Sequence, residues 1–216
     1  MEEVFLIKVL VIGAAGKVGR LIVEKIQQTD YTPVAMVRSK DQKEMFEKKG
    51  VTAVMGDLEK DFESAYADVD AVIFAAGSSK ETGAEMTIII DQEGAIKATD
   101  RAVHFGVQRF VMLSSMAADR PEAGDHSIKH YLFAKHRADE YLKKSGVPYT
   151  IIRPGPLTNG EGKGRVFLSE HVNGGESISR EDVADVLVKA LKHPKAENKS
   201  FDVVEGDTPV EDLFRH

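Results

Sequence analysis

The stretch KVLVIGAAGKVGR, residues 8–20, decides which fold the rest of this sequence can adopt. It opens with an apolar run at 9–12 that ends abruptly at a glycine, and a helical pattern of apolar residues then runs from 21 to 26. Three glycines recur at intervals of three residues between the two patterns: Gly13, Gly16 and Gly19. The stretch therefore predicts a strand, a glycine-rich turn and a helix.

Each of these glycines has a physical role in such a turn. Gly13 allows a tight turn, Gly16 lets a pyrophosphate approach the backbone because it has no Cβ, and Gly19 lets the helix pack closely on the strand. The first turn of the helix presents unbonded N–H groups and a positive dipole end to the phosphates. We therefore predict a dinucleotide-binding turn, with an ordinary glycine-rich turn as the alternative. Its predicted contacts are Gly13, Ala15, Gly16, Lys17, Val18 and Gly19.

Apolar strand patterns alternate with helical patterns along the whole chain. Strands are predicted at 5–12, 33–37, 51–55, 71–75, 109–113, 149–153 and 200–204. Helices are predicted at 17–28, 41–49, 61–67, 84–105, 131–145 and 180–191. Continuous apolar strands between helices are typical of a parallel sheet covered on both faces. The predicted fold is α/β: a doubly wound, mostly parallel Rossmann sheet of about seven strands with helices on both faces.

The composition excludes several function classes. The net charge is −6, from 29 basic and 35 acidic residues, so we expect no nucleic-acid or acidic-membrane partner. No cysteine is present among the 216 residues, which excludes disulfides, a thiolate nucleophile and cysteine-ligated metals. No histidine spacing resembles a zinc site, and no metal is expected. The acidic start at Met1 and the short apolar runs predict neither a signal peptide nor a membrane span, so the expected location is the cytoplasm.

Two long irregular spans, 116–130 and the glycine-rich 154–179, follow the carboxyl ends of predicted strands. Ligands bind at that edge of an open α/β sheet, and long loops in a compact domain are usually functional. We therefore expect one NAD(P)-binding domain over residues 1–216, with a small substrate-side region at 154–180. The expected partner is a small-molecule substrate, and the sequence indicates no particular oligomeric state.

The end of the second predicted strand indicates which dinucleotide is bound. NAD sites usually carry an acidic residue there for the ribose 2′-hydroxyl, whereas this chain has Arg38, Ser39 and Lys40. A guanidinium suits a 2′-phosphate by its charge and by its bidentate geometry. NADP is therefore favoured over NAD. The alternative is that Arg38 and Lys40 only make the loop soluble.

The ends of the next two predicted strands carry further candidate cofactor contacts. Asp57 can accept a hydrogen bond from an adenine amino group while Leu58 packs on the ring, although Asp57 could equally be a helix cap or a turn residue. After the fourth strand, small residues leave room for the ribose and pyrophosphate or simply form a turn: Ala75, Ala76 and Gly77.

A candidate acid–base pair follows the fifth predicted strand, which ends in Ser114 and Ser115. Tyr131 and Lys135 are four residues apart, so they share one face of a helix. A phenol with an ordinary pKa of about 10 is a poor acid–base catalyst at neutral pH. A nearby ammonium and the positive charge of a nicotinamide would lower that pKa and stabilise the phenolate. The Y-x-x-x-K spacing is common by chance. The prediction of an acid–base pair therefore depends on its position after the strand that ends in Ser114 and Ser115.

Together these motifs resemble the short-chain dehydrogenase/reductase superfamily over essentially the whole chain. They are most similar to its atypical members, which are NAD(P)-binding, epimerase/dehydratase-like proteins related to NmrA-like proteins. The residues that carry the resemblance are the glycine turn, the Arg38 strand end, Ser115, Tyr131-x-x-x-Lys135 and the sequence IRPG at 152–155.

The resemblance implies a Rossmann fold and a role for each site residue. Tyr131 would donate or accept the proton, Ser115 would polarise the reacting carbonyl, and Lys135 would hold the ribose and tune the tyrosine. Further implied cofactor contacts are Ser114 and, near the nicotinamide, Arg153, Pro154 and Gly155.

Three departures from the family pattern bear on the reaction class. Asp91 stands where many relatives have an asparagine in the long central helix, which puts the proton-relay role of that position in question. The interval from Ser115 to Tyr131 is shorter than in sugar-nucleotide epimerases. The chain also ends soon after its seventh predicted strand, without the large substrate lobe of those epimerases.

The function that these observations favour is an NADP-dependent oxidoreductase acting on a small carbonyl-like substrate. A second hypothesis is an NmrA-like sensor that binds NADP without turnover, and a third is a nucleotide-sugar epimerase or dehydratase. The Ser115, Tyr131 and Lys135 combination favours the enzyme over the sensor, because a sensor has no need of an acid–base pair.

Overall fold

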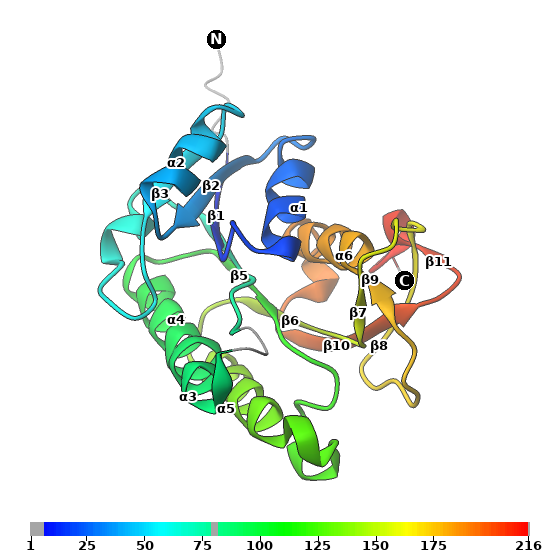
Figure 1. The fold of residues 1–216 in the computed structure, drawn as a ribbon. Coiled ribbons are helices and arrows are strands. Elements are labelled where there is room, and N and C mark those ends of the chain that lie inside the picture. Colours follow the sequence, from blue (N-terminus) through cyan, green and yellow to red (C-terminus); the bar gives the residue numbers. More distant parts are fainter. Residues whose placement is uncertain (1–6, 79–81, 216) are drawn as a thin grey trace.

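The computed structural model describes residues 7–78 and 82–215, and nine strands within them form one sheet (Figure 1). The order across the sheet is β11-β8-β10-β6-β5-β4-β1-β2-β3. These strands are β1 (Lys8–Ile12), β2 (Thr32–Val37), β3 (Thr52–Met55), β4 (Ala71–Phe74), β5 (Arg109–Leu113), β6 (Tyr149–Pro154), β8 (Arg165–Ser169), β10 (Lys199–Glu205) and β11 (Thr208–Pro209). A separate two-stranded sheet pairs β7 (Leu157–Thr158) with β9 (Ile178–Ser179).

The seven strands predicted from the sequence are the seven parallel strands of the large sheet. Val11 of β1 lies beside Ala35 of β2 and Ile73 of β4, in the centre of the sheet. All six contacts between neighbours from β3 to β10 are parallel, which confirms the predicted doubly wound fold. The strand predicted at 5–12 begins at Lys8, and residues 5 and 6 lie outside the described part of the chain.

The sequence prediction of about seven strands missed the antiparallel edge of the sheet. β8 lies inside the span 154–179 that was expected to be irregular, and it pairs antiparallel with both β10 and β11. Only Val166 of the five β8 residues is fully buried, and Phe167 is exposed. A half-exposed edge strand lacks the continuous apolar run that identifies the buried parallel strands.

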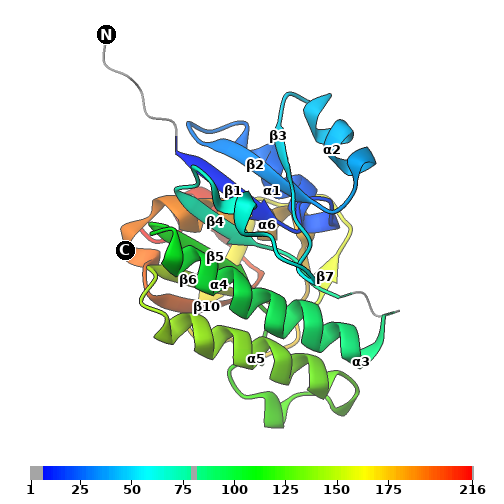
Figure 2. The same ribbon diagram turned by 90° about the vertical axis from the view of Figure 1, so that its left-hand side faces the viewer.

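Helices cover both faces of the sheet, as predicted (Figure 2). One core layer combines Val9 and Val11 with Ile22 of α1 (Lys17–Ile26) and Leu187 of α6 (Arg180–Lys192). The other combines Leu10 and Ile12 with residues of α4 (Ala95–His104) and α5 (Lys129–Lys144). Because alternate residues of a strand point to opposite faces, the continuous apolar β1 serves both layers.

Two of the predicted helices take a different form. The helix expected at 84–105 consists of α3 (Gly83–Met86), a π-helical segment η2 (Thr87–Gly94) and α4. The helix expected at 61–67 is a short 3₁₀ helix, η1 (Glu63–Tyr66), whose Tyr66 hydroxyl donates to the Ala98 carbonyl oxygen over 2.7 Å. Shorter 3₁₀ turns are η3 (Pro121–Ala123), η4 (His126–Ile128), η5 (Pro194–Ala196) and η6 (Val210–Asp212), and α2 is Lys40–Glu47. In the described ranges, no helix has both the length and the apolar character needed to cross a membrane.

Candidate active site

The glycine turn after β1 has the close packing that its sequence predicts. Gly13 adopts a φ of +86°, and a Cβ there would lie 2.6 Å from the backbone nitrogen of Ala76. A Cβ on Gly19 would overlap the carbonyl oxygen of Gly13. Both residues must therefore be glycine for α1 and the loop after β4 to approach the end of β1.

Gly16 has a different environment. A Cβ there would meet only the Gly13 carbonyl oxygen, at 3.1 Å, so the fold itself does not require glycine. Gly16 is the N-cap residue of α1, where no side-chain bond caps the helix and the first turn contains no acidic residue. The first N–H groups of α1 thus remain available for an anion, which is the property expected of a phosphate site.

A cavity of about 400 Å³ opens at this turn, along the carboxyl ends of β1, β2, β3 and β4. Eight of the predicted cofactor contacts line it: Gly13, Ala15, Gly16, Arg38, Leu58, Ala75, Ala76 and Gly77. The other lining residues are Ile12, Met36, Val37, Gln42, Gly56, Ser78, Thr82, Met86 and Ile90. None of these described lining residues is acidic. The cavity thus joins a helix N-terminus, an exposed cation and an apolar floor, which fits a dinucleotide.

Arg38 is the cation of this cavity. It follows β2, is exposed, and donates its backbone N–H to Oε1 of Gln42 over 3.0 Å. Ser39 has a structural role, because its hydroxyl accepts the Gln42 N–H and caps α2. Lys40 is the exposed first residue of α2 and is not among the residues that line the cavity. Of the three predicted contacts at the end of β2, Arg38 alone lines the cavity.

Asp57 acts as a turn residue. Its Oδ1 accepts the backbone N–H of Glu59 over 3.1 Å, and its other oxygen lies 3.8 Å from the ammonium of Lys60. Leu58 lines the cavity while Asp57 does not, so the structure favours the turn alternative for the carboxylate. Lys17 is exposed and Val18 is buried in the core below the turn, and neither lines the cavity.

The predicted acid–base residues gather beyond the carboxyl end of β5. The Lys135 ammonium lies 5.6 Å from the centre of the Tyr131 ring and donates to the Leu113 carbonyl oxygen over 3.3 Å. The Ser115 side chain is close enough to the Tyr131 phenol to lower its pKa. The helical spacing and the strand end thus bring Ser115, Tyr131 and Lys135 together as the sequence predicts.

The pKa of Tyr131 is nevertheless raised. Burial is the largest cause, and the Lys135 ammonium opposes it, as the sequence argument expects. The carboxylate of Asp91 adds to the upward shift. In the chain by itself, desolvation thus outweighs the ammonium. The expected lowering of the pKa also involves the positive charge of a bound nicotinamide, and it stays a prediction.

The ammonium of Lys135 is paired with the carboxylate of Asp91. Its Oδ1 lies 2.9 Å from the ammonium of Lys135, and only 0% and 4% of the two side chains are exposed. Burial alone would lower the pKa of Lys135, but the Asp91 carboxylate raises it above its ordinary value. Lys135 is thus a permanently charged partner of Asp91 at neutral pH.

Ser114 and Arg153 form a second buried network instead of lining the cavity. The Ser114 hydroxyl donates to Oδ2 of Asp139 over 3.0 Å, and Nε of Arg153 lies 3.1 Å from the same oxygen. Burial raises the pKa of Asp139, while Arg153 and Ser114 oppose that shift. The side chains of Ser114 and Arg153 therefore bond to Asp139 and do not line the cavity, and their contact with the cofactor stays a prediction.

Pro154 and Gly155 continue from Arg153 at the end of β6. The Pro154 carbonyl oxygen accepts the Met116 N–H over 3.0 Å, and the Gly155 N–H donates to Val203 over 3.0 Å. A Cβ on Gly155 would overlap the Glu176 carbonyl oxygen. Pro154 thus holds the loop after β5 to the end of β6, and Gly155 holds that end to β10 and to the segment before β9. Neither residue lines the cavity.

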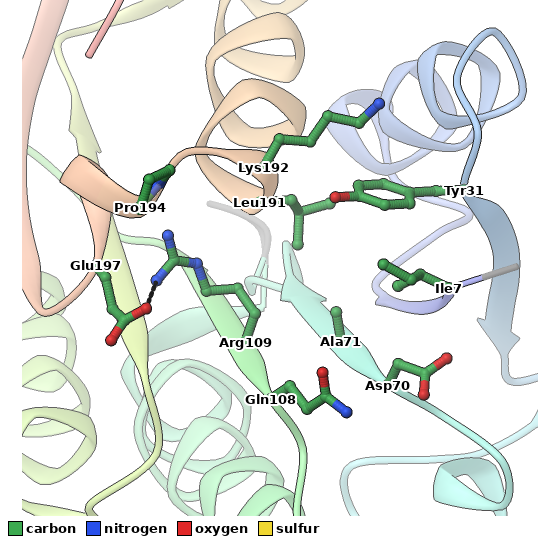
Figure 3. Close-up of a pocket in the computed structure, with 10 residues that line it drawn as sticks. All are labelled: Ile7, Tyr31, Asp70, Ala71, Gln108, Arg109, Leu191, Lys192, Pro194 and Glu197. Carbon is green, nitrogen blue, oxygen red and sulfur yellow. Dashed lines mark ion pairs between the residues drawn. The ribbon is translucent and has the colours of Figure 1, made fainter. Parts of the chain in front are cut away.

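A second cavity, of about 250 Å³, lies at the opposite edge of the sheet, where β4 and β5 begin (Figure 3). Its charged groups are already partnered. Arg109 donates to the Ala190 and His193 carbonyl oxygens at the end of α6 and pairs with Glu197 over 3.2 Å. The Lys192 ammonium lies 4.6 Å from the centre of the Tyr31 ring. These contacts anchor α6 to the sheet, so the cavity beside the glycine turn is the candidate binding site.

Sequence reasoning missed part of the site. Gln42 and Gly56 line the cavity. The signal for Gly56 was its position directly after the strand predicted at 51–55, whereas Gln42 lies in the first turn of a helix and carried no signal. Asp139 carried no motif, because its partners Ser114 and Arg153 lie on other elements. Asp91 was singled out only as a departure from a family pattern, and its contact with Lys135 had no sequence signal.

The fold and the cavity define a class of protein: a protein with a Rossmann sheet whose cavity suits a nicotinamide dinucleotide. Residues 13–194 match the NAD(P)H-binding family, and the chain belongs to that family.

Relatives extend this assignment. The chain is 40% identical over 212 residues to a protein of Bacillus subtilis (strain 168) named uncharacterized sugar epimerase YhfK, across 96% of this chain and 99% of that protein. A solved structure from Bacillus halodurans, named as an NAD-dependent epimerase/dehydratase, is 43% identical with a TM-score of 0.93, covering 96% of this chain and 98% of that one. The oxidoreductase YlbE of Lactococcus lactis has a TM-score of 0.84 at 28% identity, covering 97% and 98%.

Proposed function

We propose that the protein is an NADP-dependent oxidoreductase of the short-chain dehydrogenase/reductase type that acts on a small carbonyl-like substrate. The observation that carries this proposal is the gathering of Ser115, Tyr131 and Lys135 beside the loop that lines the dinucleotide cavity. An acid–base pair next to a hydride carrier is what carbonyl reduction requires.

The residues present fit a nicotinamide dinucleotide. The unbonded N–H groups of α1 and the absence of a Cβ at Gly16 suit a pyrophosphate, and the small residues Ala75 and Ala76 leave room beside it. When bound, such a cofactor supplies or accepts the hydride of the reaction. The rest of the chemistry falls to the chain.

NADP is the proposed form because of the charge at the end of β2. Arg38 lines the cavity where a 2′-phosphate would lie, and none of the described lining residues carries a carboxylate for a 2′-hydroxyl. The guanidinium is exposed and has a full set of donors for a phosphate.

The chain's own residues supply the proton and the orientation. Tyr131 holds a proton on its phenol and would give it to the carbonyl oxygen of the substrate. Ser115, beside that phenol, would donate a hydrogen bond to the same oxygen. Lys135 is held rigidly by Asp91 and the Leu113 carbonyl oxygen. We further propose that residues 1–216 act as one cofactor-binding domain, with the region 154–180 on the substrate side.

The test is a screen of aldehydes, ketones and quinones for NADPH oxidation, followed by Tyr131→Phe. Tyr141→Phe is a matched control, because Tyr141 lies on the same helix but is exposed and bonds Asp100. We expect a rate loss of about 10²–10⁴ in Tyr131→Phe, the usual contribution of general acid–base catalysis, and none in Tyr141→Phe. Full activity in Tyr131→Phe contradicts the proposal. NADPH binding without turnover of any carbonyl favours a sensor.

A second candidate, an epimerase or dehydratase, is favoured by the names of two relatives. Cofactor stoichiometry separates it from the first. An oxidoreductase consumes one NADPH for each product molecule, whereas an epimerase returns its cofactor to the starting state. Measuring NADPH loss against product formed on any substrate that is found therefore decides between the two.

A further inference from the structure

The buried carboxylate of Asp91 connects the cofactor cavity with the acid–base pair. Its Oδ2 accepts the backbone N–H of Ser78 over 2.8 Å, and its Oδ1 lies 2.9 Å from the Lys135 ammonium. A Cβ on Gly77 would lie 3.1 Å from Asp91 Oδ1, so the carboxylate packs directly against the loop. Gly77 and Ser78 both line the cavity. One side chain thus touches both parts of the proposed site.

The π-helical segment Thr87–Gly94 places Asp91 there. Thr87, one turn earlier, also contacts the same loop, because its hydroxyl lies 3.0 Å from that of Ser78. The segment therefore holds the loop after β4 at two points, Thr87 and Asp91. Single π-helical turns inside longer helices are often found at functional sites, where they redirect a side chain.

Direct pairing with Asp91 changes what Lys135 can do for Tyr131. The charged groups that face Tyr131 are Lys135 and Asp139 on its own helix and Asp91 from η2, with Ser115 as a neutral neighbour. An ammonium whose charge is balanced by a carboxylate at 2.9 Å exerts a much weaker field on the phenol than an unpartnered one. The geometry around Tyr131 thus favours the neutral phenol.

We propose that Asp91 is a positioning residue that fixes Lys135 to the loop after β4 and keeps Tyr131 protonated into the alkaline range. Tyr131 then serves as the proton donor in reduction. This inference rests on the proposed function. In reduction, a bound reduced cofactor would supply the hydride to the carbonyl carbon, and Tyr131 would give its phenol proton to the carbonyl oxygen. Solvent then returns a proton to the phenolate.

The first test needs neither cofactor nor substrate. Phenolate absorbance is titrated in the whole chain, and the Tyr131 signal is the difference between each protein and the same protein carrying Tyr131→Phe. Asp91→Asn keeps an acceptor for the Ser78 N–H but removes the charge. We expect the Tyr131 phenolate to appear about one pH unit lower in Asp91→Asn. A shift of this size is near the low end of the pKa shifts that a neighbouring charge causes.

Asp202→Asn is the matched control, because Asp202 is another fully buried carboxylate but does not face Tyr131. Asp202 lies on β10, which β6 separates from β5, and its Oδ2 accepts the Val172 N–H. The Tyr131 titration should be unchanged in Asp202→Asn. A Tyr131 midpoint that is unchanged or higher in Asp91→Asn overturns the inference.

The second test uses the substrate found by the screen. Reduction needs the protonated phenol, so the rate should be flat at lower pH and fall as pH rises through the pKa of Tyr131. That fall should begin about one pH unit earlier in Asp91→Asn. If Tyr131→Phe keeps full activity, the proposed function fails. If Tyr131→Phe is inactive but the alkaline fall does not move in Asp91→Asn, only the role of Asp91 fails.

Discussion

The hydroxyl of Ser114 donates to Oδ2 of Asp139 over 3.0 Å, deep inside the molecule, whereas the next residue, Ser115, faces Tyr131. The two serines therefore have separate roles, and we predict that Ser114→Ala mainly lowers stability. The loss should be about 1–3 kcal/mol in the free energy of unfolding, because a buried acceptor loses a partner. Urea denaturation measures it, and NADPH affinity should stay at the wild-type value. A stability equal to that of the wild type contradicts this role for Ser114.

Ser115→Ala should have the reverse effect: a loss of turnover with little change in stability. Ser115 is half-buried, and its hydroxyl lies beside the Tyr131 phenol and has a weak contact of 3.4 Å with the Met116 carbonyl oxygen, so its removal should leave stability nearly unchanged. Turnover should fall by about 10²–10³, the usual cost of losing one donor to a developing oxyanion. Steady-state kinetics on a substrate from the carbonyl screen would show this, and equal activity of Ser115→Ala and the wild type rules the role out.

Arg38→Ala should weaken NADPH binding and leave NADH binding nearly unchanged. The expected loss is about 1–3 kcal/mol, because the lost contact is a charge-assisted hydrogen bond to a phosphate. Lys40→Ala is the control, since Lys40 is an exposed cation two residues away that does not line the cavity. Fluorescence titration of both cofactors measures the difference. Equal NADPH affinity in Arg38→Ala and Lys40→Ala would remove Arg38 from the site.

The glycine turn, which depends on backbone geometry, could be predicted from the sequence. The network of side-chain contacts around Lys135 and Asp91 could not. Gly13, Gly16 and Gly19 follow an apolar run, and their spacing alone fixes a strand, a turn and a helix. In contrast, Lys135 and Asp91 come from different helices, and their contact depends on a π-helical segment with no sequence signal. Which of two adjacent serines faces the site depends on where β5 ends, and strand ends are the least certain part of a sequence prediction.

Gly16→Val should abolish cofactor binding without unfolding the chain. A Cβ at this N-cap position would meet only the Gly13 carbonyl oxygen of the protein, yet a side chain there would occupy the space that a pyrophosphate needs. Gly160→Val is a matched control, because a Cβ at Gly160 meets nothing within 4 Å and the residue does not line the cavity. Circular dichroism reports the fold and fluorescence titration reports NADPH affinity. A folded Gly16→Val protein with normal affinity would place the phosphate site elsewhere.

Lys135→Met should destabilise the protein even without cofactor, because Asp91 would become a buried carboxylate without its cation. Removing one partner of a buried ion pair typically costs about 3–5 kcal/mol. The double variant Lys135→Met with Asp91→Asn removes both charges, so it should recover a large part of that loss. Urea denaturation of the wild type, the two single variants and the double variant gives the coupling between the residues as a double-mutant cycle. If the double variant is no more stable than Lys135→Met, the ion pair is not what makes Lys135 necessary to the fold. Turnover should stay low in the double variant either way, since Tyr131 would still lack the ammonium that stabilises its phenolate when the proton leaves.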